Sequence, residues 1–222
     1  MEMKPPSGLA RLYLDAVLEH DSDAAIDLVV QSVDEGMPVQ EALLSVIQPA
    51  QYELGRLWER NLITVAQEHF GSGVAQLLIA RLYSRFPRSP VTGGRLVTAC
   101  VDDELHDIGA RIVTEFFALA GWDTHYLGGN KTAKAIREAV RDLKADVAAI
   151  SATMYPHVDT ARRVIANLAA DVGDDPIVVL VGGQAFNASP DLSTAIGAHG
   201  WAPDAEEAVT LAQRLVRVVD EE

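Results

Sequence analysis

The stretch "RLVTACVDDELHDIGARIV", residues 95–113, changes character at its middle. Its first seven residues are mostly apolar, as in strands that are buried on both faces of a parallel sheet. Residues 107–121 then carry apolar side chains at helical spacing and end at a glycine. A short acidic loop with one imidazole, His106, lies between the two segments. The stretch therefore predicts a strand, a loop that carries His106, and a helix.

The alternation of strand and helix continues to the C-terminus. Further strands are expected at 123–128, 146–151, 176–183 and 199–202, and further helices at 132–145, 157–172 and 204–219, with one short helix before the last strand. This spacing predicts an α/β unit with a five-stranded parallel sheet of the flavodoxin-like (Rossmann-like) kind. Ligands bind such sheets beyond the carboxyl ends of the strands. That edge would hold His106, Ser151 and the pair Gly182 and Gly183.

Residues 6–86 carry the helical period and few strand signals. Four helices are expected, at 8–21, 22–36, 38–61 and 63–86. Short turns between them predict an antiparallel bundle, so the fold class is all-α followed by α/β. The segment "PRSPVTGGR", residues 87–95, is rich in proline, glycine and serine and is typical of a linker. We therefore expect a four-helix bundle at 1–87, a linker at 88–94 and the α/β domain at 95–222.

Three residues are expected to define helix ends in the bundle. Ser22 is placed as an N-cap, and Gly36 stands where a C′ glycine ends a helix. Thr64, with Gln67 three residues later, has the spacing of a capping box.

Composition excludes several classes of function. The chain of 222 residues has a formal net charge of −14, which argues against binding to nucleic acid or to an anionic membrane. Its single cysteine, Cys100, excludes an internal disulfide and a multi-cysteine metal site, and its apolar surroundings predict an inert buried thiol. No signal core and no long apolar segment are visible. We expect a soluble, cytoplasmic protein.

The acidic loop has the chemistry of a metal ligand that an acid orients. Glu104 stands two residues before His106, and a carboxylate on one ring nitrogen fixes the tautomer and raises the basicity of the other. No second protein ligand completes a tetrahedral set beside this histidine. The remaining ligands would therefore come from a macrocycle. The glycine pair Gly182 and Gly183 would let such a flat group approach the backbone.

These residues together resemble the signature of cobalamin-binding domains. The signature reads Asp-x-His-x-x-Gly, Ser-x-Leu and Gly-Gly, and the resemblance covers about residues 95–218. The matching positions are Glu104, His106, Asp107 and Gly109, then Ser151 and Thr153, then Gly182 and Gly183. Two positions depart from the signature, because Glu104 replaces Asp and Thr153 replaces Leu.

The resemblance implies a role for each part of the signature. His106 would bind cobalt from below, and the dimethylbenzimidazole tail would insert beside the sheet, lined by Ser151, Gly182 and Gly183. His157 stands where methionine synthase relatives place a third member of the ligand relay.

A second resemblance lies in the bundle. Trp58 precedes Glu68 and His69 with the spacing Trp-x9-Glu-His, and this is similar to the CarH/LitR-type cobalamin photoreceptors. It implies that Trp58 packs on the adenosyl group of adenosylcobalamin, that Glu68 bonds its ribose, and that His69 lies beside them. Glu59 stands where these photoreceptors often have the histidine that captures cobalt after photolysis.

The chain also resembles stand-alone sensory modules without a MerR-type DNA-binding domain, including photocobilins. That implies a second, non-covalent bilin such as biliverdin.

Three functions follow from these resemblances. The first is a light sensor rather than an enzyme, working as a homo-oligomer or light-dependent oligomer with a downstream signalling protein and no direct contact with nucleic acid or membrane. The second is a corrinoid protein that carries methyl groups for a methyltransferase system. The third, a mutase subunit, would need a substrate barrel. Trp58 and Glu68 favour the light sensor, since a methyl carrier has no need of a ribose acceptor.

Overall fold

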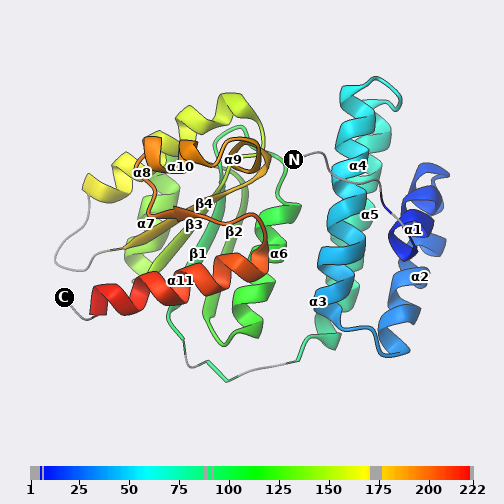
Figure 1. The fold of residues 1–222 in the computed structure, drawn as a ribbon, viewed down its shortest axis with the longest axis horizontal. Coiled ribbons are helices and arrows are strands. Elements are labelled where there is room, and N and C mark those ends of the chain that lie inside the picture. Colours follow the sequence, from blue (N-terminus) through cyan, green and yellow to red (C-terminus); the bar gives the residue numbers. More distant parts are fainter. Residues whose placement is uncertain (1–5, 7, 88–89, 92, 171–176, 221–222) are drawn as a thin grey trace. The chain divides into compact units, whose positions relative to one another are not determined.

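The computed structural model describes residues 6, 8–87, 90–91, 93–170 and 177–220. The chain forms two compact units, Met1–Pro87 and Arg88–Glu222 (Figure 1). The predicted linker at 88–94 includes residues 88, 89 and 92, which lie outside the described residues.

The first unit is helical, as its sequence period predicts. It contains α1 (Leu9–Leu18), α2 (Ser22–Asp34), α3 (Val39–Glu41), a π-helical segment (Ala42–Ile47), α4 (Gln48–Glu59) and α5 (Val65–Leu82), which ends in a 3₁₀ turn (Tyr83–Arg85). The helix expected at 38–61 is thus one run of α3, π-helical segment and α4. Its core is fully buried and includes Tyr13, Leu43, Leu54 and Leu78.

Two of the three predicted helix ends are confirmed. Thr64 and Gln67 form a capping box, with Thr64 Oγ1 3.2 Å from Gln67 N and Gln67 Oε1 2.9 Å from Thr64 N. Gly36 has φ 116° and ends α2, because the amides of residues 36 and 37 bond back to the carbonyls of Val33 and Ser32. The N-cap prediction was wrong by one residue. Asp21 caps α2 through Oδ1, which lies 2.9 Å from Ala24 N.

The second unit is the predicted five-stranded parallel sheet. Its elements are β1 (Arg95–Val101), α6 (Ile108–Leu119), β2 (Asp123–Lys131), α7 (Ala133–Leu143), β3 (Val147–Ser151), α8 (Val158–Ala170), β4 (Val178–Gly182), α9 (Gln184–Ala188), α10 (Asp191–Ala195), β5 (Gly200–Trp201) and α11 (Ala205–Asp220). Strand order is β2-β1-β3-β4-β5, which confirms the doubly wound fold. Two short helices, α9 and α10, replace the single one expected, and β2 is longer than predicted.

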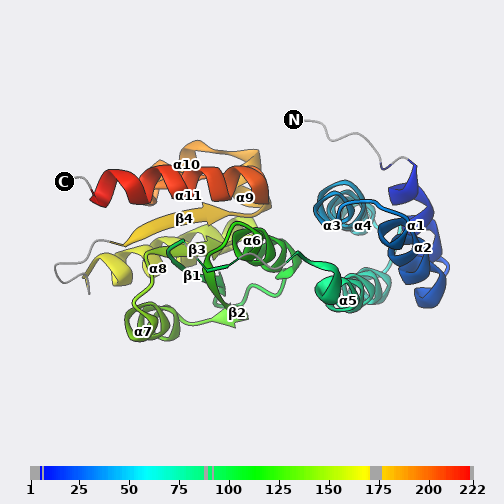
Figure 2. The same ribbon diagram turned by 90° about the horizontal axis from the view of Figure 1, so that it is seen from below.

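Helices cover both faces of the sheet (Figure 2). Alternate residues of β1 point to opposite faces, so Val97 and Ala99 pack in the core with α7 and α8, while Leu96 packs with α6 and α11. The connection after β1 leads to β2 on one side of β1, and the connection after β2 leads to β3 on its other side. The direction of the strand order therefore reverses between β1 and β3. In a sheet of this order the crevice between the carboxyl ends of β1 and β3 is where ligands bind. None of the described helices is both long and apolar enough to cross a membrane.

Candidate functional site

The loop between β1 and α6 is held in a tight turn at this crevice. Glu104 N bonds to Val101 O at 3.0 Å, and Asp103 adopts a left-handed φ of 64°. Asn130, at the end of β2, fastens the turn from outside. Its side-chain Oδ1 accepts a hydrogen bond from Asp103 N at 3.0 Å, and its backbone amide donates one to Glu104 O at 2.8 Å. These hydrogen bonds therefore fix the backbone of the loop directly before His106.

The Glu104 carboxylate joins two loops of the site. Its Oε1 accepts from His106 N at 3.0 Å and lies 2.5 Å from His106 Nδ1. Its Oε2 accepts from the amides of Thr153 at 2.7 Å and Met154 at 3.1 Å and lies 2.9 Å from His157 Nδ1. Glu104 is fully buried, so both oxygens are committed to these groups. The added methylene of glutamate lets one carboxylate reach both loops.

The electrostatics of this cluster suit a metal ligand. Burial alone would raise the pKa of Glu104, but hydrogen bonds from His106, His157 and backbone amides lower the pKa to about 2. Because the ionised carboxylate only accepts, His106 Nδ1 donates to it, and in the neutral imidazole Nε2 then has the lone pair. The His106 side chain is 44% exposed.

Small side chains line the face of the sheet behind His106. In the register of the strands, Cys100 pairs with Ser151 and Ser151 with Gly182, and one row further back Thr98 pairs with Ala149. Paired residues of neighbouring strands point to the same face, here the one that α6 and α11 cover. We call these five residues the small-residue strip. A Cβ built on Gly182 would meet no atom within 4 Å, so there is open space beside the strip.

Gly182 and Gly183, the predicted glycine pair, have different structural roles. Gly183 has φ 108°, and a Cβ there would lie 2.5 Å from Ala152 O. Its freedom serves a close approach between the ends of β3 and β4, whereas Gly182 borders open space. The expectation that both glycines admit a flat ligand thus has geometric support at Gly182. A Cβ on Gly109, in the first turn of α6, would also meet nothing within 4 Å.

Several neighbours shape the site without carrying its central chemistry. Asp107 precedes α6, and its Oδ2 accepts from Tyr126 Oη at 2.8 Å. Cys100 is buried, and burial raises the pKa of its thiol to about 12, in keeping with an inert thiol. Leu105 and Tyr155 stand beside the two histidine loops and are 70% and 61% exposed. Large exposed apolar side chains at this edge offer a surface that a flat apolar ligand would bury.

The three residues predicted in the helical unit have their own contacts there. Trp58 is half-buried in the last turn of α4, and Glu68 lies in the first turn of α5. Glu68 Oε1 accepts from Ser72 Oγ at 3.1 Å. His69 is exposed, with Nε2 3.6 Å from Glu68 Oε2. The structure thus brings Glu68 and His69 together, and it gathers Glu104, His106, Thr153 and His157 in the α/β unit.

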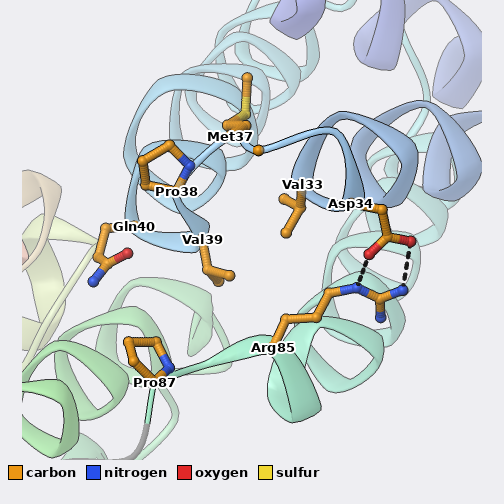
Figure 3. A pocket seen from close by; sticks show the side chains of 9 residues that line it. Val33, Asp34, Met37, Pro38, Val39, Gln40, Arg85 and Pro87 are labelled. Atoms are coloured by element: carbon orange, nitrogen blue, oxygen red, sulfur yellow. Dashed lines mark hydrogen bonds and ion pairs between the residues drawn. The ribbon is translucent and has the colours of Figure 1, made fainter.

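The helical unit also has a hollow of about 490 Å³ beside the turn between α2 and α3 (Figure 3). Met37, Pro38 and Val39 line it, together with Asp34 and Arg85. Arg85 Nε and Nη2 donate to the two Asp34 oxygens at 2.6 and 2.8 Å, so its charge is already neutralised. This hollow has no group poised for chemistry, and the Glu104 cluster remains the stronger candidate.

Sequence reasoning missed three residues at the site. Asn130 ends the segment "GGN" in β2, and its contact with the Glu104 loop depends on the tertiary structure, where a Cβ on Gly129 would lie 3.0 Å from Glu104 O. Met154 contributes only its backbone amide, which no side-chain pattern can indicate. Thr98 lies inside an apolar strand, and its position on the small-residue strip depends on strand register.

Comparison with known proteins identifies the family. Residues 94–210 match the family model described as B12 binding domain, and residues 9–83 match a second model with the same description. The chain is 24% identical to a corrinoid protein of Desulfitobacterium hafniense (strain Y51), over 90% of this chain and 94% of that protein. It is 26% identical to dimethylamine corrinoid protein 2 of Methanosarcina acetivorans, over 91% of this chain and 93% of that protein.

Solved structures share the fold. The monomethylamine corrinoid protein of Methanosarcina barkeri matches with a TM-score of 0.81 at 19% identity, over 91% of this chain and 96% of that one. The methanol:cobalamin methyltransferase complex of the same organism matches with a TM-score of 0.52 at 18% identity, over 94% of this chain and 80% of that one.

These findings correct the photoreceptor interpretation. The relatives that match both units are corrinoid proteins, including dimethylamine corrinoid proteins, so the light-sensor function and the light-dependent oligomer are wrong. The Trp58 and Glu68 spacing did not separate a photoreceptor from a corrinoid protein, since the relatives that match both units are corrinoid proteins. Glu68 in addition bonds within its own helix. Because residues 94–210 match the model described as B12 binding domain, the chain belongs to the B12-binding domain family.

Proposed function

We propose that this protein is a corrinoid protein that carries methyl groups for a methyltransferase system. The observation that carries the proposal is similarity over both units at once, at 26% identity over 91% of the chain to a dimethylamine corrinoid protein. A match to the α/β unit alone would have left mutases and sensors open, because function differs among proteins that share this fold.

The residues of the α/β unit fit a corrinoid. Their donor set is one partly exposed imidazole backed by a buried carboxylate, which would suit a group that needs a single protein ligand. Open space beside Gly182 and the small side chains behind it suit a flat tail. When bound, the corrinoid supplies a cobalt that accepts a methyl group from one partner and gives it to another.

In this proposal each predicted residue has a task. His106 would hold the cobalt, and Glu104 and His157 would orient its imidazole. Ser151, Thr153 and Gly182 would border the tail, Gly183 would keep the ends of β3 and β4 close together, and Asp107 and Gly109 would shape the start of α6. The backbone amide of Thr153 donates to Glu104, a contact that does not depend on the side chain, so a threonine can stand where the family signature has leucine.

Trp58, Glu68 and His69 of the helical unit remain predicted cofactor-binding residues. A methyl group would replace the adenosyl group that was expected, and no bilin is needed. A methyl carrier must expose its methyl group to its partners, so these three residues are expected to affect access more than affinity.

The test is methyl transfer in a defined system. The protein is loaded with hydroxocobalamin, reduced, and mixed in turn with methyltransferases that act on dimethylamine, monomethylamine or methanol. Donor consumption and the visible spectrum report methylation, with His106→Ala as the impaired variant and Glu138→Ala as an exposed control. If a known dimethylamine corrinoid protein turns over in the same assay while this one stays unmethylated with every donor, the proposal fails.

A further inference from the structure

The small-residue strip contains one polar atom that its surroundings do not satisfy. Thr98 is 1% exposed, and its Oγ1 has no hydrogen-bond partner among the residues that the structure describes. A buried hydroxyl without a partner is unfavourable and uncommon. Valine has the same shape and would avoid the penalty. A threonine at this position therefore indicates a partner that comes from outside the chain.

The register places Thr98 within the strip. Pairing between β1 and β3 is regular from Leu96 to Cys100, so Thr98 lies beside Ala149 and points to the same face as Cys100 two residues on. The next row behind it, Leu96 and Val147, is wholly apolar and buried. Thr98 is thus the last polar group before the closed core.

The other polar groups of the strip are already engaged. The Cys100 thiol interacts with the Ser151 side chain, and its Sγ also lies 3.8 Å from His106 O. Thr114, on the covering helix α6, bonds its own helix through Oγ1 to Ala110 O at 2.9 Å. Among these hydroxyls and thiols, only that of Thr98 has its hydrogen-bonding capacity unused within the described part of the chain.

We propose that Thr98 determines which lower base this protein prefers, favouring corrinoids whose base carries a hydrogen-bonding group on its far edge. This inference rests on the corrinoid binding of the proposed function. A hydroxyl-substituted benzimidazole can both donate to and accept from Thr98 Oγ1. A dimethyl-substituted benzimidazole presents only methyl groups and leaves the hydroxyl unpaired. A site that holds a buried polar group discriminates against ligands that fail to pair it.

The experiment compares two cobamides that differ only in the lower base, one with 5-hydroxybenzimidazole and one with 5,6-dimethylbenzimidazole. Dissociation constants are measured on the full-length apoprotein by tryptophan fluorescence and by the visible spectrum. We expect wild type to bind the hydroxylated form roughly tenfold more tightly, the effect of about one net hydrogen bond. In Thr98→Val the ratio should fall to about one or reverse. Thr114→Val is the matched control, and the ratio should stay at its wild-type value.

Thermal unfolding of the apoprotein gives a second readout. Thr98→Val should melt no lower than wild type, because it removes an unpaired hydroxyl and keeps the volume. Thr114→Val should melt lower, because its hydroxyl has a partner.

The outcomes separate the two proposals. A ratio near one in wild type, a ratio that Thr98→Val leaves unchanged, or a lower melting temperature for Thr98→Val overturns the role of Thr98 and leaves corrinoid binding intact. Failure of both cobamides to bind overturns the proposed function and this inference together.

Discussion

Replacement of Glu104 by glutamine tests how the site prepares His106. Glutamine keeps the length and volume but exchanges one acceptor oxygen for a donor amide. Three donors converge on Glu104 Oε2, whereas two groups contact Oε1. The amide oxygen of the glutamine should therefore occupy the Oε2 position. The new NH₂ group then faces His106 and donates to Nδ1. The imidazole proton must move to Nε2, and a protonated Nε2 cannot bind cobalt.

The size of the effect follows from the contacts that are lost. Removal of an acceptor that orients a metal-bound histidine typically costs about 10–100-fold in affinity. The partly buried hydrogen bond from the His106 backbone amide is also lost, which costs about 1–3 kcal/mol of unfolding free energy. For a unit of the size of Arg88–Glu222 that corresponds to a fall of roughly 3–11 °C in melting temperature.

The assay is titration of the apoprotein with hydroxocobalamin, followed by the absorption change on histidine ligation and by calorimetry. Glu138→Gln is the control, because the Glu138 side chain is 43% exposed and its Oε1 lies 3.8 Å from Lys134 Nζ in a surface pair, so this change should affect affinity and melting little. Wild-type affinity and an unchanged ligation spectrum in Glu104→Gln would refute the orienting role of the carboxylate.

Glu104→Asp tests the contacts of Glu104 with the loop that follows β3. Aspartate is shorter by one methylene, about 1.5 Å. It should keep its near contact with His106 and lose the amides of Thr153 and Met154. Faster hydrogen exchange at those two amides, with cobalt ligation largely retained, is the expected result. Unchanged exchange would show that the reach of glutamate is not needed.

Three further changes test other parts of the structure. Gly183→Ala should lower the melting temperature by several degrees, because its Cβ would lie 2.5 Å from Ala152 O at φ 108°. Gly182→Ala should melt normally and weaken corrinoid binding. The reverse pattern in calorimetry and titration would contradict the roles given to the two glycines. Asp21→Ala should destabilise the helical unit by about 1 kcal/mol, measured by urea unfolding, and Ser22→Ala should cost less, since Asp21 is the N-cap. The fragment 88–222 should fold alone and bind corrinoid, and a fragment without cooperative melting would contradict the domain boundary.

Local pattern was enough for the architecture. Apolar runs and helical spacing between residues 95 and 219 predicted all five strands of the parallel sheet, because buried parallel strands and amphipathic helices carry distinct periods. Capping at Thr64 and termination at Gly36 were also local, since the groups that bond lie within five residues of each other. Asp21 was missed because two adjacent residues, Asp21 and Ser22, are both good caps.

The sequence by itself determined the fold class and placed His106 beside an acidic residue after the first strand, because both depend on residues close together in the chain. Only the tertiary structure decided that Glu104 reaches forward to Thr153, Met154 and His157, and that Thr98 Oγ1 has no hydrogen-bond partner among the described residues. Those contacts join residues about fifty positions apart, through the register of β1 against β3. Register is set by packing of the whole sheet, and no short segment encodes it.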